Sequence, residues 1–256
     1  MAKFRIDQLQ IYPVRSIGGM SVPRAQITPA GSLAGDREWV VVRPDGSLIW
    51  QGDIPRMTLL SARLEDGALI LMGHDGHIGP DAEDDPEGQT TVTQDGFTLA
   101  GIDQGGAVAT WLSDQLGTRC RLVRVGVEAH RWGGLNPIHA ISLASLSALN
   151  TRLVKDGHQA VEAERFRPNV ILSGSHAAFD EELETDLNFS EASLTMREPC
   201  VRCELPNIRR DNANRGKQPL KMIGQMSKDR PMASPASFGM YCAAHGPVLI
   251  VGMITH

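Results

Sequence analysis

Several features that mark specialised protein classes are missing from this chain of 256 residues. No apolar run approaches the ~20 residues that a membrane-spanning helix needs, so we expect no membrane span. Four cysteines are too few for a disulfide scaffold, and we expect them to be reduced thiols. Aromatic residues make up only 5% of the sequence, so the core must be built mainly from aliphatic side chains.

Concentrated positive charge is absent as well. The formal net charge is -5, and no group of lysines and arginines forms a stripe, which argues against nucleic acid as a partner. The sequence contains neither a G-x-G-x-x-G nor a G-x-x-x-x-G-K-[ST] pattern, so it predicts neither a dinucleotide fold nor a P-loop. The first residues enter a strand pattern without the apolar core of a signal peptide, and we expect a cytoplasmic protein.

The first hundred residues instead contain short apolar stretches separated by turns. Alternating apolar residues over 4–11 and the apolar run over 39–42 predict strands. Asp-Gly pairs supply the positive φ of a tight hairpin, and three of them lie between apolar stretches: Asp45-Gly46, Asp66-Gly67 and Asp95-Gly96. Regular short strands with such turns favour a barrel or a sandwich over a sheet built from βαβ units.

The pattern changes near Gly101. Apolar residues at helical spacing predict three helices, over residues 107–116, 142–154 and 219–226. Residues 170–172 and 247–251 are expected to form strands, and the residues 73–88, rich in glycine, proline and acidic side chains, to form a loop.

Together these elements predict an α+β fold that is mostly β. We expect two β-barrel-like modules with a few peripheral helices. The first module is a small barrel over residues 1–95, and the second is a larger barrel with helices over residues 96–256. No internal repeat or low-complexity tract interrupts this organisation.

The strongest local motif is the C-x-x-C pair of Cys200 and Cys203, which has four interpretations. A thioredoxin-type redox pair opens a helix, which the downstream sequence disfavours. With Cys242 and His245 the pair could bind structural zinc, although the two pairs lie further apart than in zinc ribbons. One cysteine could be a thiolate ligand of a softer metal centre, with Arg202 supplying positive charge. The fourth interpretation is two buried apolar cysteines.

Arginines at the ends of predicted elements form a second signal. The four are Arg15, Arg37, Arg167 and Arg202. A guanidinium binds phosphate through two parallel hydrogen bonds, so these four side chains would form an anion pocket if the fold brought them together.

Five motifs, taken in order along the chain, resemble a known family. Tyr12-Pro13-Val14-Arg15-Ser16 and Gly35-Asp36-Arg37-Glu38-Trp39 resemble the N-terminal β-barrel module that precedes MOSC domains. Three further motifs resemble the MOSC domain itself, which is shared with the C-terminal part of molybdenum cofactor sulfurase. They are Phe166-Arg167-Pro168-Asn169-Val170, Pro199-Cys200-Val201-Arg202-Cys203 and Phe238-Gly239-Met240-Tyr241. The resemblance extends from about residue 12 to residue 251, and the chain is similar to the bacterial and mitochondrial amidoxime-reducing molybdoenzymes.

The resemblance implies a molybdenum cofactor, Mo-molybdopterin, whose metal is bound by one protein cysteine. The family's ligand matches Cys203, whereas Cys200 matches no assigned role. The family's cofactor contacts match eight further positions: Arg15, Ser16, Arg37, Arg167, Asn169, Val201, Arg202 and Tyr241. Arg15 stands where a lysine is usual, and Val201 where a small polar residue is common. Residues 204–211 replace the family's Thr-Thr-x-Asp-Pro-x-Thr-Gly-like stretch, which bears on the substrate range.

The family's activity implies reduction of N-hydroxylated or N-oxygenated small molecules, with Cys203 as the catalytic residue that anchors the metal. Each turnover consumes two electrons. The chain lacks a dinucleotide fingerprint, and its cysteines do not fit a ferredoxin-type cluster, so we expect an external electron donor, a ferredoxin or a flavoprotein reductase. Two alternatives are a non-redox module that carries the molybdenum cofactor or a sulfur group, and a zinc-stabilised β-protein that uses Cys200, Cys203, Cys242 and His245.

Overall fold

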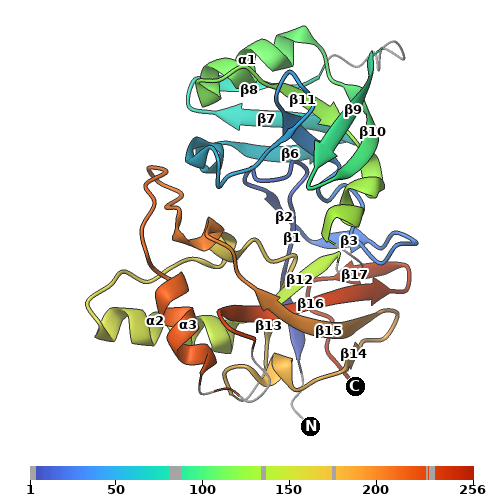
Figure 1. Cartoon of the computed structure of the whole chain (residues 1–256). Helices are drawn as coiled ribbons and strands as arrows, with labels where there is room; N and C mark the ends of the chain where they lie inside the picture. Colours follow the sequence, from blue (N-terminus) through green and yellow to red (C-terminus); the bar gives the residue numbers. More distant parts are fainter. Residues whose placement is uncertain (1–3, 81–87, 134–136, 175–176, 229, 231–233) are drawn as a thin grey trace.

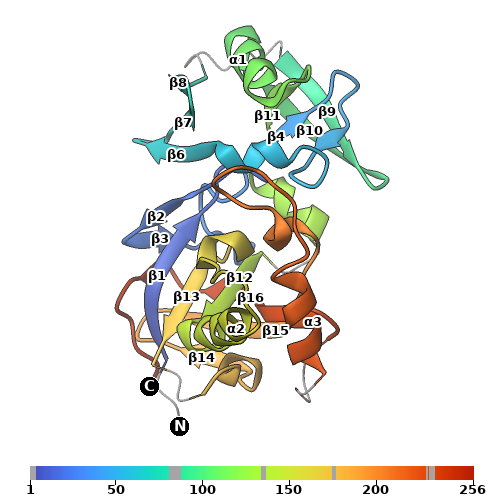
Figure 2. The ribbon, with the colours of Figure 1, turned by 90° about the vertical axis from the view of Figure 1, so that its left-hand side faces the viewer.

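The computed structural model describes residues 4–80, 88–133, 137–174, 177–228, 230 and 234–256. Within these residues the chain forms two units, one above the other in Figure 1 and Figure 2. Short strands make up most of both units, and three α-helices in the described residues pack against them. The fold is therefore α+β and mostly β, as the sequence predicts.

A seven-stranded sheet is the centre of the lower unit. Its strands, in spatial order, are β14 (Asp186–Asn188), β15 (Ser193–Val201), β16 (Ser237–His245), β12 (Ile138–Ser142), β13 (Val170–Ser173), β1 (Arg5–Ile11) and β2 (Met20–Val22). Two helices, α2 (Leu143–Lys155) and α3 (Leu220–Ser227), pack beside each other on this unit (Figure 2). Their buried side chains share one apolar cluster with Phe166 and Phe238. A two-stranded sheet of β3 (Arg24–Gln26) and β17 (Val248–Ile250) completes it.

The upper unit combines two smaller sheets and one helix. The five-stranded sheet has the order β5 (Leu48–Ile49), β4 (Trp39–Val42), β11 (Arg121–Arg124), β10 (Phe97–Asp103) and β9 (Gln89–Gln94). The three-stranded sheet consists of β6 (Ser61–Glu65), β7 (Ala68–Gly73) and β8 (Gly76–Ile78). Helix α1 (Gly106–Leu116) buries Val108, Leu112 and Leu116 in a core to which both sheets contribute.

Strand pairing crosses the division of the chain that we expected at residue 95. The first strand, β1, pairs antiparallel with β13, so it belongs to the sheet of the second half of the chain. Conversely, β10, α1 and β11 follow residue 95 and belong to the upper unit. Residue 95 itself lies in the turn of the β9–β10 hairpin. The upper unit consists of β4 to β11, and the lower unit of β1 to β3 and β12 to β17.

The predicted helices and hairpin turns are confirmed. Each of the three Asp-Gly pairs lies in the turn of a hairpin, between β4 and β5, β6 and β7, and β9 and β10. Asp66 and Asp95 have φ angles of 50° and 49°, and the glycine after each also has a positive φ. Two successive left-handed residues are what a type I′ turn requires.

The predicted loop over residues 73–88 needs correction. Gly76–Ile78 pairs with β7 as a short strand, β8, so the first part of this segment is a hairpin. Residues 81–87, the acidic part of the expected loop, lie outside the described residues. In the part of the chain that the structure describes, no helix combines the length and the apolar character that crossing a membrane requires.

A buried carboxylate holds the start of α2. The hydroxyl oxygen of Ser142 caps the helix by accepting a hydrogen bond from the backbone N–H of Ser145 at 3.1 Å. Glu181 is fully buried and accepts hydrogen bonds from the hydroxyls of Ser142 at 2.8 Å and Ser145 at 2.6 Å. Negative charge near a helix N-terminus is favourable, so the cap and the carboxylate form one stabilising network.

We expect Ser142→Ala to lower the free energy of unfolding by about 2 kcal/mol, because the cap and a hydrogen bond to a buried carboxylate are lost together. Urea denaturation followed by circular dichroism measures this change. Ser147→Ala, on the exposed face of the same helix, is the control and should stay within about 0.5 kcal/mol. Equal, small effects of the two substitutions would contradict the network.

Candidate functional site

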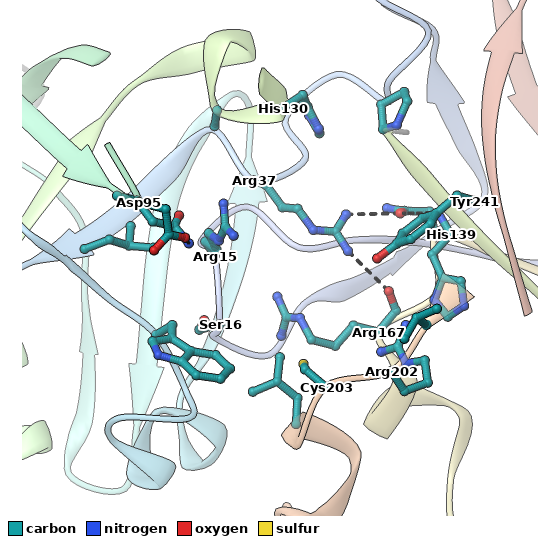
Figure 3. A pocket seen from close by; sticks show the side chains of 18 of the residues that line it. Arg15, Ser16, Arg37, Asp95, His130, His139, Arg167, Arg202, Cys203 and Tyr241 are labelled. Carbon is teal, nitrogen blue, oxygen red and sulfur yellow. Dashed lines mark hydrogen bonds between the residues drawn. The ribbon is translucent and has the colours of Figure 1, made fainter. Parts of the chain in front are cut away.

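A pocket of about 790 Å³ lies between the two units. This volume falls in the range of sites for cofactors and small molecules. All nine residues that the sequence singled out line the pocket: Arg15, Ser16, Arg37, Arg167, Asn169, Val201, Arg202, Cys203 and Tyr241. Figure 3 shows most of these side chains around one space, so the structure brings the five motifs together.

The topology of the seven-stranded sheet explains this convergence. Because β1 and β13 run antiparallel, residues that follow β1 lie close to residues that precede β13. Arg15 therefore meets Arg167 although the two are far apart in the sequence. On the other side of β13 lie β12 and β16, and Tyr241 in β16 pairs with His139 in β12. The end of β15, which leads to Cys203, is the next neighbour of β16.

Three of the nine predicted pocket residues have left-handed backbone conformations. Ser16, Arg37 and Arg167 have φ angles of 70°, 58° and 55°. Residues other than glycine rarely adopt such angles, and the surrounding structure must hold them there. The backbone N–H of Arg37, for example, donates to the carbonyl oxygen of Tyr12 at 2.7 Å. Strained positions of this kind gather at functional sites, and here three of them gather at one pocket.

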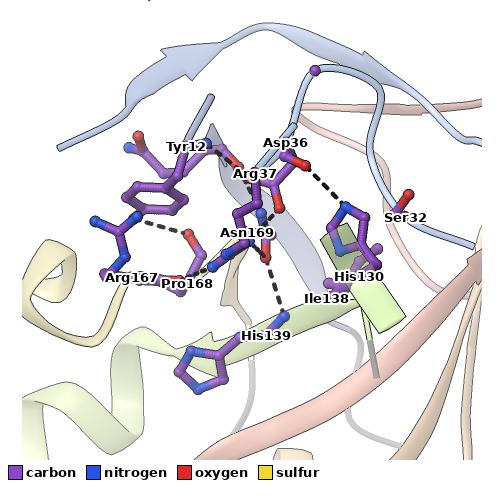
Figure 4. Close-up of polar contacts among 12 residues, drawn as sticks. Tyr12, Ser32, Asp36, Arg37, His130, Ile138, His139, Arg167, Pro168 and Asn169 are labelled. Atoms are coloured by element: carbon purple, nitrogen blue, oxygen red, sulfur yellow. Dashed lines mark hydrogen bonds and ion pairs between the residues drawn. The ribbon is translucent and has the colours of Figure 1, made fainter. Parts of the chain in front are cut away.

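A buried network fixes Arg37 (Figure 4). The guanidinium forms an ion pair with the fully buried carboxylate of Asp36 and donates to Oδ1 of Asn169 at 3.0 Å. Asp36 also accepts a hydrogen bond from the backbone N–H of Tyr12 at 2.8 Å. Asn169 accepts from the backbone N–H of His139 at 3.2 Å and donates to the carbonyl oxygen of Gln10 at 3.2 Å. The network ties the loop that carries Arg37 to β1, to β12 and to the residue that precedes β13.

Arg167 packs against the ring of Tyr12. Its guanidinium carbon lies 4.3 Å from the ring centroid, and that of Arg37 lies 5.2 Å away. Nη1 of Arg167 donates to the carbonyl oxygen of Ile17 at 2.6 Å. The Tyr12 hydroxyl donates to the carbonyl oxygen of Pro168 at 3.2 Å, and burial raises the pKa of Tyr12 to about 12. Tyr12 is therefore a neutral platform for two cations.

Positive charge exceeds negative charge in the pocket. Among the residues that the structure describes, four arginines line it against two carboxylates, Asp53 and Asp95, and Asp53 also pairs with Arg43 at 3.1 Å. Burial, together with the neighbouring charge of Arg37, lowers the pKa of Arg15 to about 10 and that of Arg167 to about 9. Both groups stay protonated near pH 7, and an anion bound among them would relieve their mutual repulsion.

The two cysteines of the C-x-x-C motif have opposite environments. Cys200 lies at the end of β15 and is fully buried, whereas Cys203 is exposed and its sulfur lies at the pocket (Figure 3). Between them, Arg202 donates from Nη1 to the sulfur of Cys200 at 2.7 Å and from Nη2 to the carbonyl oxygen of Phe166 at 2.8 Å. One thiol is therefore available to a ligand, and the other is enclosed.

The geometry does not support the zinc alternative. No group of three or more histidine, cysteine or acidic side chains is arranged to hold a metal ion among the residues described here. Cys242 is buried in the middle of β16, opposite Ile138 of β12, and His245 is exposed at the far end of that strand. The pair also opens no α-helix, because a short 3-10 turn at Leu205–Asn207 follows it, which argues against a thioredoxin-type couple.

Sequence reasoning missed several residues of the pocket. His130 lines it from the 3-10 helix Gly126–Gly133, and His139 lines it from β12. Asp95 reaches it from the β9–β10 turn (Figure 3). Trp50 of the upper unit adds an aromatic wall. The Asp-Gly motif predicted the turn correctly, but nothing in the sequence indicated that this turn faces the ends of β1 and β15.

Apolar side chains occupy one part of the pocket wall. Leu48 and Trp50 come from the upper unit, and Val201 and Leu205 from the segment around the C-x-x-C motif. Val201 is 54% exposed, so its side chain is available to a molecule bound in the pocket. The pocket thus has a cationic part and an apolar part with the Cys203 thiol at its wall.

Family models match both halves of the chain. Residues 3–119 match the MOSC N-terminal beta barrel domain, and residues 127–253 match the MOSC domain. Their junction, between residues 119 and 127, lies at β11, the last strand of the upper unit.

Curated relatives match most of the chain. Mitochondrial amidoxime reducing component 2 of Rattus norvegicus is 30% identical over 268 residues, which cover 92% of this chain and 78% of that protein. Mitochondrial amidoxime-reducing component 1 of Mus musculus is 29% identical and covers 94% and 78%, respectively. The molybdenum cofactor sulfurase of Oryza sativa subsp. japonica is 27% identical over 90% of this chain but only 32% of its own length.

The cationic part of the pocket predicts anion binding without any cofactor. We expect pyrophosphate to raise the melting temperature of the cofactor-free protein, and Arg167→Ala to weaken its apparent affinity about 10-fold, because a charged hydrogen bond contributes about 1.5–3 kcal/mol. Arg24→Ala, an exposed arginine on β3, is the control and should leave the affinity unchanged. An undiminished pyrophosphate response in the Arg167 variant would show that the anion binds elsewhere.

Proposed function

The chain belongs to the MOSC-domain family, and we propose that its pocket binds a molybdenum cofactor, Mo-molybdopterin, and that the protein reduces N-hydroxylated or N-oxygenated small molecules. The observation that carries the proposal is the convergence of four arginines and one exposed thiol, Cys203, on a single pocket. The rat and mouse relatives, named for amidoxime reduction, support the choice of substrate class.

The residues present fit this cofactor in charge and donor type. A pterin cofactor carries a phosphate, for which the guanidinium groups of Arg15, Arg37 and Arg167 are suitable ligands. A thiolate is a suitable ligand for a soft, redox-active metal, and Cys203 supplies an exposed sulfur. Arg202 lines the same pocket and adds a fourth guanidinium to this set.

Each of the nine residues has a proposed role in holding the cofactor. Cys203 binds the metal, and the remaining eight contact the organic part: Arg15, Ser16, Arg37, Arg167, Asn169, Val201, Arg202 and Tyr241. Val201 has no side-chain donor, so it would contribute through its backbone or by apolar contact. When bound, the metal supplies two-electron removal of oxygen from an N–O bond. The protein supplies position and electrostatics.

The overall reaction is balanced by two electrons and two protons. An amidoxime is converted to an amidine, and its oxygen leaves as water. The apolar wall of Trp50, Val201 and Leu205 would hold the organic part of the substrate and exclude water from its N–O group. Asp95 and His130 also line the pocket and are the candidate groups for proton transfer on its upper side.

We propose that the electrons come from a separate protein, a ferredoxin or a flavoprotein reductase. Among the described residues the cysteines do not gather into a cluster site, and the sequence has no dinucleotide fingerprint. A second candidate function rests on the rice relative, which is named a molybdenum cofactor sulfurase. On that alternative the pocket would carry the cofactor or a sulfur group without reducing N-hydroxylated compounds.

We expect Cys203→Ala to abolish molybdenum retention and Cys200→Ala to preserve most of it, because only Cys203 is exposed to the pocket. The measurement is metal analysis with pterin fluorescence on protein purified from cells that make the cofactor. Pterin binding without molybdenum in the Cys203 variant would agree with a ligand role. Loss of the metal in the Cys200 variant alone would reverse the assignment.

We expect no reduction of an amidoxime by the purified protein with NADH alone, and turnover with reduced viologen under anaerobic conditions. The reason is that the chain offers a site for the catalytic metal but none for collecting electrons from a dinucleotide. Chromatographic detection of the amidine measures turnover in both reactions, the one with NADH and the one with reduced viologen. Activity with NADH alone would contradict an external donor, and inactivity with viologen at full molybdenum occupancy would favour the carrier alternative.

A further inference from the structure

His139 lies between two backbone carbonyl groups. It is 4% exposed, and its Nδ1 lies 3.2 Å from the carbonyl oxygen of Phe166 while its Nε2 lies 3.0 Å from that of Phe238. A carbonyl oxygen can only accept, so each ring nitrogen must donate. A neutral imidazole has one N–H, and only the doubly protonated imidazolium satisfies both contacts.

Gly239 makes this arrangement possible. Its φ is +74°, and a Cβ atom at this position would lie 2.7 Å from Nε2 of His139 and 2.4 Å from the carbonyl oxygen of Ala140. Any side chain here would therefore push the 238–239 backbone away from the ring. The glycine of the Phe238-Gly239-Met240-Tyr241 motif keeps the Phe238 carbonyl within hydrogen-bond distance of the imidazole.

A buried imidazolium needs a counter-charge, because an unpaired buried cation is costly. The groups that face this region are Cys200 in β15, Arg202 just after this strand, and Tyr241 and Cys242 in β16. Arg202 is itself a cation, and its Nη1 lies 2.7 Å from the sulfur of Cys200. Two cations thus adjoin one sulfur that is fully buried.

We propose that Cys200 is a buried thiolate, the shared counter-ion of His139 and Arg202, and that it acts as a positioning residue that holds Arg202 at the pocket. The inference concerns the protein without its cofactor, so it stands or falls independently of the proposed reductase activity. It assigns a role to Cys200, the cysteine of the C-x-x-C motif that is not the proposed metal ligand.

The charges around the two buried thiols agree with this assignment. Burial alone would raise the pKa of Cys200, but the charges of His139 and Arg202 lower it to about 6. Cys242 is equally buried, and burial raises its pKa far above the usual range of a thiol. The two cysteines, on neighbouring strands, therefore form a natural pair for comparison.

The thiolate also affects how positive charge is distributed among the arginines of the pocket. Its negative charge compensates Arg202, whereas Arg15, Arg37 and Arg167 retain an excess of positive charge in the same pocket. An anionic group that enters the pocket is therefore attracted mainly to these three arginines. The cysteine pair thus consists of an exposed thiol, Cys203, at the pocket and a buried thiolate, Cys200, whose charge compensates Arg202.

The test is the ultraviolet absorption of thiolate in the cofactor-free full-length protein. We expect the difference spectrum between the wild type and Cys200→Ser to contain one thiolate band at about pH 7 and to lose it as the pH falls through about 6. The matched variant Cys242→Ser should give no band at about pH 7, because that thiol stays protonated. Cys203 is present in all these proteins and cancels.

His139→Gln provides a second test that keeps Cys200 in place. Glutamine can donate to a carbonyl group but carries no charge, so the band at about pH 7 should disappear and return only as the pH rises toward the ordinary thiol range near 8.5. A merely structural role of His139 would leave the titration of Cys200 unchanged. The proposal is overturned if Cys200→Ser removes no band, or if His139→Gln leaves the band as it is in the wild type.

Discussion

Like charges held side by side are the constraint on which the site depends. Arg37 and Arg167 both pack against the ring of Tyr12, and one buried carboxylate, that of Asp36, lies next to them. Two guanidinium groups at this separation repel each other, and the repulsion is stronger away from bulk water. The fold maintains them with backbone carbonyl oxygens, with Asn169 and with the face of an aromatic ring. Such a preorganised excess of cationic donors favours an anionic ligand.

This constraint accounts for the topology around the pocket. The two arginines lie on loops with left-handed backbone conformations, and each loop must be fixed by elements on both sides. The antiparallel pairing of β1 with β13 does so by joining the first strand of the chain to the sheet of the second half. A β1 strand confined to the upper unit would separate Arg15 from Arg167. The pairing of β1, from the start of the chain, with β13 in the second half is therefore needed to form the site.

The sequence predicted the local structure well and the long-range structure poorly. Turn chemistry and apolar spacing depend on neighbouring residues, so the Asp-Gly hairpins and α1 with its Gly117 stop were found. Strand pairing between β1 and β13 leaves no local pattern, and the expected boundary at residue 95 missed it. The pocket residues were found because whole motifs resemble a family. His139 was missed because a histidine in a buried strand shows its significance only through its carbonyl partners.

The spacing of the C-x-x-C motif does not distinguish between its possible functions, whereas the positions of its two side chains do. Strand β15 directs Cys200 inward, and the chain leaves the strand after Val201, so Cys203 turns toward the pocket. The same four-residue spacing in a helix would place both sulfurs on one side and suit a redox pair. Here Arg202 binds the inner sulfur, and the outer sulfur stays open. Two chemically identical residues thus lie in different environments, because one is buried beside the Arg202 guanidinium and the other is exposed at the pocket.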